Sequence, residues 1–455
     1  MRKSKQFLGI VLLILVLLVG VSCSTLSSQE DTTETTLGIT SENSLESNEG
    51  ELVSEYIANI SSDNMIKTIT FLSSKDNARV TGFEGESAAA DYITEHFKNL
   101  GLEATEESFP VKAYAPLSLS LQVVSEENRV IEEAKALSYS LGTDEAGLTA
   151  EVVNVGLGAD EDYKDLDVTG KMVLISRGGE YFYIKTDRAA QKGAIGAIFY
   201  DPTSEGAISA TLTRLSKIPA VSIAPKTAQS LIDSINSDKG LTVNLKLDII
   251  HKDATSKNII SVYPSINNPD GKIVIVGAHY DGVDTPAAND NASGTSVILE
   301  IARILKEQKV ELPFDVKFIA FGAEEIGLVG SNYYANHMDI DEKNATIAML
   351  NFDMVGVGDT FEISMAGGEN ASKLIGLARN ALKEMGLSLD VSQKENSDHS
   401  SFSYVGIPAI LIEAGPFKDY HTDKDTVEGI EPTVLSNSCE LGIKLLVEEL
   451  TKQFN

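Results

Sequence analysis

The stretch KIVIVGAHYD, residues 272–281, and the segment SGTSVILEIARILKEQ, residues 293–308, that follows it determine the expected fold. The first is a short apolar run, typical of a buried strand, and the second carries apolar residues at helical spacing. The same alternation continues with FDVKFIAFGAEE (314–325), GLVGSNYYANHM (327–338), ATIAMLNFDMVG (345–356) and IPAILIEAG (407–415). It predicts an α/β domain in which a mixed, largely parallel sheet is sandwiched by helices.

Polar side chains gather where these predicted strands end, which is where open α/β sheets bind ligands. They are His279 and Asp281, Asp290 in the next loop, Glu324 and Glu325, Asp353, and finally Tyr420, His421 and Asp423. Imidazoles and carboxylates suit zinc, and one carboxylate can bridge two ions. A bound cation would also explain the adjacent glutamates in an apolar stretch, because one could bind the ion while its neighbour acts as a base.

Each of these residues also has an ordinary structural explanation. Asp290 could simply form a turn, and the glutamate pair could begin a solvated helix. A lone histidine is usually a satisfied surface or core residue, and His96, His251 and His337 are interpreted in that way because no acidic residues at a strand end accompany them. The coincidence of ligand types at successive strand ends is what favours a metal centre.

The motifs HYD, NDNASG, AEEIGLVGS, NFDMVG, SDHSSF and YHTDKDT occur in this order and resemble those of the M28 family of zinc aminopeptidases. The resemblance covers nearly all of residues 258–430. The segment RVTG, residues 79–82, and the helical pattern after it resemble the N-terminal portion of the same family. The resemblance implies a zinc-exopeptidase type of fold.

Carried over to this chain, the resemblance implies two zinc ions per chain. Asp290 would bridge both ions. His279 and Asp353 would complete the shell of one ion, and Glu325 and His421 would complete the shell of the other. The histidine of SDHSSF, His399, is not predicted to be a ligand, and a structural role and a substrate contact both stay open for it.

The resemblance also assigns catalytic roles. Glu324 would be the general base, and later the acid, for a metal-activated water, and Asp281 would orient the imidazole of His279. Tyr420 would donate a hydrogen bond to the developing oxyanion. The substrates would be peptides with a free N-terminus, which makes the predicted activity that of an aminopeptidase.

Two alternatives differ in class from this prediction. One is a glutaminyl-cyclase-like enzyme, which works with a single zinc ion, and the other is a non-catalytic surface-binding lipoprotein of the same fold. The complete ligand set, together with the NFDMVG and YHTDKDT contexts, favours the hydrolase.

The pattern of apolar and polar residues changes between residues 115 and 250. Short Val- and Leu-rich runs such as KMVLISRGG (171–179) and AIGAIFYD (194–201) predict a mostly β module with a few helices. Its place in the chain resembles that of an inserted protease-associated (PA) domain. We therefore expect a peptidase domain made of residues 51–114 and 251–455, with a PA-like insert at 115–250.

The N-terminus predicts export from the cytoplasm. A basic head, an apolar run from Phe7 to Val21 and small residues before Cys23 indicate a signal peptide over residues 1–22. VGVSC, residues 19–23, resembles a bacterial lipobox, so Cys23 is expected to carry a lipid anchor, with a Ser-, Thr- and Glu-rich disordered stalk over 23–50. Cleavage by ordinary signal peptidase, which would give a secreted protein, is the alternative; an uncleaved anchor is a third.

The charge of the chain excludes one class of partner. With 37 basic and 67 acidic residues, the formal net charge is −30. Such a chain repels nucleic acid. No sequence feature specifies an oligomeric state.

Overall fold

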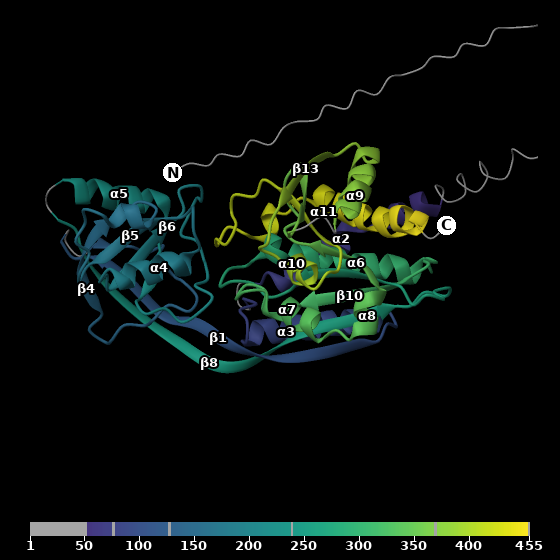
Figure 1. Ribbon diagram of the computed structural model, residues 1–455, viewed down its shortest axis with the longest axis horizontal. Coiled ribbons are helices and arrows are strands. Elements are labelled where there is room, and N and C mark those ends of the chain that lie inside the picture. The colour runs from purple at the N-terminus through teal and green to yellow at the C-terminus, as the bar shows by residue number, and fades with distance from the viewer. Residues whose placement is uncertain (1–51, 75–77, 126–128, 238–239, 368–370, 454–455) are drawn as a thin grey trace, which may run out of the picture. The chain divides into compact units, whose positions relative to one another are not determined.

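Two long strands, β1 (Ala104–Val123) and β8 (Thr242–Tyr263), pair as an antiparallel ribbon that belongs to two parts of the molecule (Figure 1). At one end of the ribbon, Ser261 of β8 pairs with Phe318 of β10 (Asp315–Phe321), and at the other end Leu245 pairs with Leu148 of β4 (Leu148–Asn154). This computed structural model describes residues 52–74, 78–125, 129–237, 240–367 and 371–453. Within them, one hydrogen-bonded sheet continues from the C-terminal α/β domain into the insert.

The sheet of the α/β domain has the order β13-β12-β14-β11-β9-β10-β8. Its four central strands are parallel: β14 (Ala409–Gly415), β11 (Thr346–Phe352), β9 (Ile273–His279) and β10 (Asp315–Phe321). At one side β12 (Thr360–Met365) runs antiparallel to β14 and carries β13 (Ser388–Gln393), and at the other side β8 runs antiparallel to β10. The predicted mixed, largely parallel sheet is confirmed.

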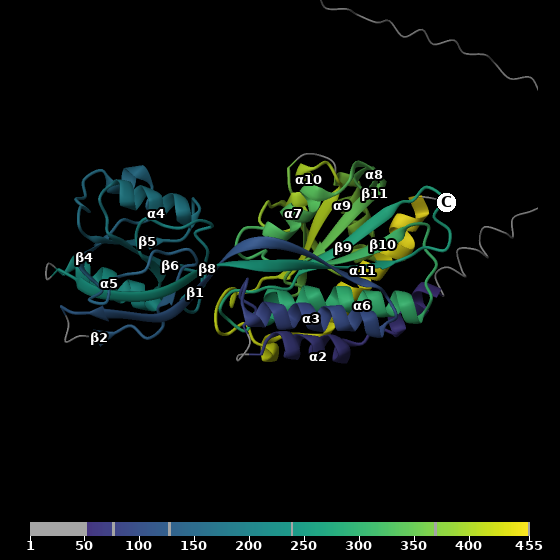
Figure 2. The ribbon, with the colours of Figure 1, turned by 90° about the horizontal axis from the view of Figure 1, so that it is seen from below.

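Helices cover both faces of this sheet, as Figure 2 shows for α3 and α6 on one side and α7 and α10 on the other. One face packs against α2 (Ser62–Leu72), α3 (Glu84–Asn99), α6 (Gly294–Glu307), α9 (Ser372–Glu384) and α11 (Pro432–Lys444). The other packs against α7 (Val329–His337) and α10 (His399–Tyr404), and α8 (Ile340–Ala345) leads into β11. Along β9, Val274 and Val276 point into the first core and Ile275 into the second, the two-residue alternation of a strand that is buried on both faces.

The insert is a smaller sheet with the order β4-β5-β6-β7-β3. Its strands are β4 (Leu148–Asn154), β5 (Met172–Ser176), β6 (Gly196–Tyr200), β7 (Ala220–Ser222) and β3 (Lys135–Ala136), and its helices are α4 (Phe182–Gln191) and α5 (Pro225–Asn236); β2 (Arg129–Val130) pairs with the end of β1. Apolar side chains of α5 and α4 belong to two separate cores of the insert. The expected limits at residues 115 and 250 fall inside β1 and β8, so they stay predictions.

The predicted signal peptide, the lipidated Cys23 and the stalk lie outside the described residues. None of the helices in the described ranges has both the length and the apolar character that a membrane span needs. The other cysteine, Cys439, is buried on α11.

Candidate metal centre

The predicted metal ligands and the predicted base come from three strand ends and two loops at the carboxyl edge of the parallel sheet. His279 is the last residue of β9, Glu324 and Glu325 follow β10, Asp353 follows β11, Asp290 lies between β9 and α6, and His421 lies in the loop after β14. Neighbouring parallel strands end at the same edge of a sheet, so residues far apart in the sequence meet there.

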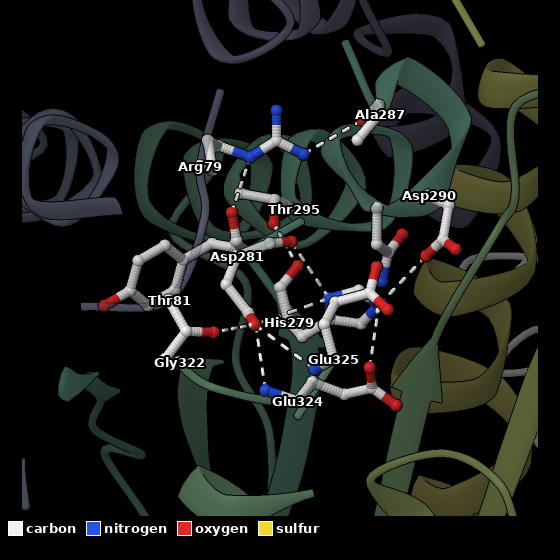
Figure 3. A network of polar contacts seen from close by, with 12 residues as sticks. Arg79, Thr81, His279, Asp281, Ala287, Asp290, Thr295, Gly322, Glu324 and Glu325 are labelled. Atoms are coloured by element: carbon white, nitrogen blue, oxygen red, sulfur yellow. Dashed lines mark hydrogen bonds and ion pairs between the residues drawn. The ribbon is translucent and has the colours of Figure 1, made fainter. Parts of the chain in front are cut away.

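Asp290 lies between the two histidines. Its Oδ1 is 3.2 Å from Nε2 of His279, and its Oδ2 is 2.9 Å from Nε2 of His421. Figure 3 shows Asp290 and both glutamates gathered around His279. Each oxygen of one carboxylate therefore faces a different imidazole, which is the arrangement that a bridging ligand requires.

Each histidine also approaches a second carboxylate. Nε2 of His279 is 3.4 Å from Oδ1 of Asp353, and Nε2 of His421 is 3.1 Å from Oε2 of Glu325. The donor atoms of His279, Asp290 and Asp353 lie within 4.8 Å of one another, and so do those of Asp290, Glu325 and His421. The two groups share only Asp290.

The donor atoms fit a metal better than they fit one another. Oε1 of Glu325 and Oδ1 of Asp353 are buried and have no hydrogen-bond partner, and Nε2 of His421 makes no hydrogen bond of normal geometry although Oδ2 of Asp290 is 2.9 Å away. A buried polar atom without a partner costs free energy, on the order of 1–3 kcal/mol each, so native proteins rarely keep several together. Imidazole nitrogens and carboxylate oxygens are the donors that zinc takes, and a cation would satisfy all three atoms.

The carboxylates change how the histidines titrate. Burial by itself lowers the pKa of His421, but Glu325 and Asp290 outweigh burial and raise this pKa to about 10. Burial likewise opposes protonation of His279, yet Glu324 and Asp353 raise its pKa well above the ordinary value. A cluster without metal therefore holds protons on its imidazoles, and a metal ion must displace them.

Glu324 differs from the predicted ligands in its distance from the histidine. Its Oε2 is 3.9 Å from Nε2 of His279, farther than the nearest oxygens of Asp290 and Asp353. Burial, and then the charges of Glu325 and Asp398 among others, raise the pKa of Glu324 well above its ordinary value, and His279 opposes them. A carboxyl group beside the cluster with a raised pKa is placed to take and return a proton.

Asp281 anchors the loop that carries the glutamate pair. Its carboxylate accepts hydrogen bonds from the main-chain N–H groups of Glu324 (2.9 Å) and Glu325 (3.2 Å), and from the hydroxyl of Thr81 (2.9 Å) (Figure 3). Nδ1 of His279 lies 3.2 Å from the main-chain oxygen of Asp281 and 3.7 Å from its carboxylate. The anchoring contacts were not anticipated from the sequence, which suggested only the orientation of His279.

Two further polar residues hold the predicted ligands in place. Asp425 accepts hydrogen bonds from the main-chain N–H groups of Asn289 (2.6 Å) and Asp290 (3.1 Å), and Ser397 donates its hydroxyl to Oδ2 of Asp353 (2.6 Å). Both residues lie in motifs that carry the family resemblance, YHTDKDT and SDHSSF, but neither is among the predicted site residues. Asp423, which was named, is exposed and pairs with Lys135 at 2.7 Å.

Arg79 of the RVTG segment is a third residue that sequence reasoning missed. It is 1% exposed, and its guanidinium donates hydrogen bonds to the main-chain oxygens of Tyr280 (2.6 Å) and Ala287 (2.9 Å) (Figure 3). These bonds fix both ends of the chain segment that leads from His279 to Asp290.

Tyr420 stacks on the ring of His421, with 3.8 Å between the ring centres and an angle of 20° between the planes. Burial, and then the charges of Asp290 and Glu325, raise the pKa of Tyr420 well above its ordinary value. The phenol therefore keeps its proton and stays a hydrogen-bond donor.

The remaining histidines stay outside the cluster. Nε2 of His399 lies 3.0 Å from the main-chain oxygen of Lys394, and burial lowers the pKa of His399 to about 4, so it is a neutral, buried side chain. In the described part of the chain, no group of candidate ligands includes His96, His251 or His337.

Comparison with known proteins identifies the family. Residues 258–446 match Peptidase family M28 and residues 148–231 match the PA domain. The chain is 33% identical over 400 residues to the aminopeptidase YwaD of Bacillus subtilis (strain 168), and the match covers 85% of this chain and 84% of that protein. The chain belongs to peptidase family M28.

Other members of the family extend the comparison. The probable lipoprotein aminopeptidase LpqL of Mycobacterium tuberculosis is 29% identical, with 83% of this chain and 82% of that protein covered. The solved structure of a zinc aminopeptidase from Bacillus subtilis is 31% identical, has a TM-score of 0.69, and matches over 84% of this chain and 94% of that chain. The M28 family and the likeness to zinc aminopeptidases, expected from the sequence motifs, and the PA domain, expected from the place of the insert in the chain, are thus confirmed.

Proposed function

We propose that this M28 protein is a di-zinc aminopeptidase that removes N-terminal amino acids from peptides. The observation that carries the proposal is the position of Asp290, whose two oxygens lie 3.2 Å and 2.9 Å from the imidazoles of His279 and His421. Asp353 and Glu325 complete two ligand groups that meet at this carboxylate. In the proposal, His279, Asp290 and Asp353 hold one ion, and Asp290, Glu325 and His421 hold the other.

The residues around the ions supply the acid–base chemistry. Zinc, when bound, would polarise the scissile carbonyl and bring the pKa of a bound water toward about 7. Glu324 would accept a proton from that water and later return it to the departing amine. The protonated phenol of Tyr420 would donate a hydrogen bond to the oxygen on which negative charge develops. Asp281 would keep Glu324 and Glu325 in place through their main-chain N–H groups.

The surroundings of the centre suit a peptide. A cavity of about 880 Å³ is lined by Tyr420 and Met354 of the α/β domain and by Arg177 and Asp201 of the insert. A second, of about 770 Å³, reaches Glu325. Both volumes lie within the usual range for ligand pockets, and the carboxylates at the centre would attract the cationic amino group of a free N-terminus.

We also propose that the enzyme acts outside the cytoplasm, attached to the membrane through a lipid on Cys23. The support is the lipobox-like VGVSC segment and the similarity to a protein that is itself named a lipoprotein. Replacing Cys23 by Ala should move the protein from the membrane fraction to the soluble fraction; unchanged fractionation would contradict the anchor.

The test of the function combines metal analysis with an assay. The purified chain should contain about two zinc ions and release N-terminal residues from aminoacyl and dipeptide substrates, lose this activity with a chelator, and regain it when zinc is added. Formation of pyroglutamate in place of amino acid release would indicate a cyclase, and a chain that binds no metal would indicate a binding protein.

A further inference from the structure

We infer that the PA insert is part of the metal centre, because the main chain at Ser209 positions the ligand His421. The inference rests on the proposed function, since it assigns the second zinc ion to Asp290, Glu325 and His421. It gives the insert a role in binding metal, beyond covering the centre.

A reciprocal pair of hydrogen bonds joins the insert to the ligand loop. The main-chain N–H of Ser209 donates to the main-chain oxygen of His421 at 2.8 Å, and Nδ1 of His421 lies 2.9 Å from the main-chain oxygen of Ser209. A neutral imidazole that donates from Nδ1 presents a lone pair at Nε2, and Nε2 is the atom that faces Asp290 and Glu325. The carbonyl of Ser209 therefore selects the tautomer and the ring orientation that bind metal.

The insert holds this carbonyl in a fixed position. The residues on either side of Ser209 are tied to the core of the insert: the main-chain oxygen of Ile208 accepts the hydroxyl of Ser222, and that of Ala210 accepts the N–H of Ser138 at 2.8 Å. Ile208 and Ala210 are also members of one apolar core of the insert. The position of the carbonyl therefore depends on the fold of the insert.

His421 needs such support more than the other ligands do. It lies in the loop after β14 with φ of +57°, a left-handed conformation that costs a non-glycine residue free energy and persists where neighbouring groups fix it. The two hydrogen bonds to Ser209 act on the backbone and on the ring of this one residue, so they fix both.

The ion pairs between the insert and the same loop contribute less. Glu205 pairs with Lys418 at 2.8 Å, with the side chains 43% and 68% exposed, and it also pairs with Lys424. Lys135 of the insert pairs with Asp423, whose side chain is 67% exposed. Exposed pairs of this kind stabilise a structure by about 0–1 kcal/mol and are screened by salt. The hydrogen bonds at Ser209 should therefore dominate, and salt should change zinc affinity little.

A proline at position 209 tests the inference. Ser209→Pro removes the N–H that holds His421 and disturbs the adjoining carbonyl, whereas Ser209→Ala keeps both main-chain groups and is the matched control. In Ser209→Pro, the second zinc ion should bind about 10- to 100-fold more weakly, as is usual when a partner of a metal ligand is lost, and the first ion should bind as before. Ser209→Ala should bind both ions with wild-type affinity.

Two measurements besides activity make the result specific. Competition with a chromophoric chelator gives the two zinc affinities separately, and the absorption spectrum of the cobalt(II) form reports the geometry at the second ion. Ser222→Ala is a smaller change, which removes the hydroxyl that anchors Ile208 beside Ser209. It should weaken binding of the second zinc ion by up to about tenfold, and it keeps the inference testable if Ser209→Pro does not fold.

Each outcome decides between two causes. Wild-type affinity for both ions in a folded Ser209→Pro protein, or an equal loss at both ions, would overturn the positioning role and leave the proposed function intact. A wild-type protein that binds no zinc, or that binds zinc without aminopeptidase activity, would instead overturn the proposed function.

Discussion

The two halves of the candidate centre are held by different means. His279 ends a central strand, its side chain is 1% exposed, and its main-chain oxygen accepts the hydroxyl of Thr295 on α6 at 2.8 Å. His421 lies in a loop, its side chain is 11% exposed, and its partner is the main chain of the insert. The order of the parallel strands places one imidazole, and a contact between domains fixes the other.

The difference shows which part of the centre can change in evolution without loss of the fold. Substitutions in the loop after β14 or in the insert can tune the half that contains His421, because neither belongs to the four parallel strands at the centre of the α/β domain. A change at the end of β9 would disturb the packing of a buried strand as well as the ligand.

The largest loss of activity should follow from substitution of Glu324, which belongs to neither half, or of Asp290, which belongs to both. Glu324→Gln removes the proposed base and keeps the shape, so turnover should fall by about 10²- to 10⁴-fold while both zinc ions stay bound. Turnover with a peptide substrate and metal content measured on the same sample check this expectation.

Asp290→Ala is the comparison variant for Glu324→Gln. Because Asp290 faces both imidazoles, its loss should remove zinc from both halves together with the activity. Full activity in Glu324→Gln would exclude it as the base, and retention of one tightly bound zinc ion in Asp290→Ala would show that the halves do not share this ligand.

A change of pH should have a smaller effect, which appears in the affinity for zinc. Without metal, carboxylates overcome burial and raise the pKa of His421 to about 10 and that of His279 well above its ordinary value, so both carry protons at neutral pH. Zinc must displace one proton from each, and its affinity for each half should therefore fall about tenfold per pH unit as the pH decreases from about 8 to about 6.

Zinc titrations at several pH values measure these slopes. A zinc affinity that did not change with pH at one half would contradict the protonation of that histidine in the metal-free protein. The two halves would then also differ in whether their histidines are protonated without metal.

The sequence predicted the half of the centre that depends on strands better than the half that depends on the insert. The ends of β9, β10 and β11 follow directly from apolar runs, and parallel strands bring their ends together. The contact between Ser209 and His421 left no trace in the sequence, because main-chain groups form it and any residue but proline could supply them.

The missed side chains had a different cause. Arg79, Ser397 and Asp425 lie in recognised motifs. Their hydrogen bonds go to the backbone next to a ligand, to a ligand's second oxygen and to a ligand's own backbone, and these depend on loop conformations that no periodicity encodes. The choice of Asp423 in place of Asp425 illustrates this, since both are acidic residues of one motif and only the fold decides which is buried.

The smallest expected effect concerns Glu86 of α3, whose carboxyl group lies near the charge of Asp281, the residue beside Nδ1 of His279. Glu86 accepts hydrogen bonds from the main-chain N–H of Gly82 (2.6 Å) and the hydroxyl of Ser256 (2.5 Å), and burial, with Asp281 nearby, raises its pKa to about 8. Because the folded-state pKa lies above the unfolded value, its contribution to stability is fully present below about pH 4.5 and is lost as the pH rises through about 8.

Glu86→Gln should remove this dependence, since glutamine keeps the shape and never ionises. Each unit of pKa shift corresponds to about 1.4 kcal/mol, so the free energy of unfolding of the variant relative to wild type should rise by at least about 1 kcal/mol between pH 5 and pH 9. Denaturant unfolding of both proteins in the same metal state measures this difference, and the pH dependence of zinc binding cancels in it. If the difference in free energy of unfolding does not change with pH, then the pKa of Glu86 is not raised in the folded protein, and neither burial nor the charge of Asp281 shifts it.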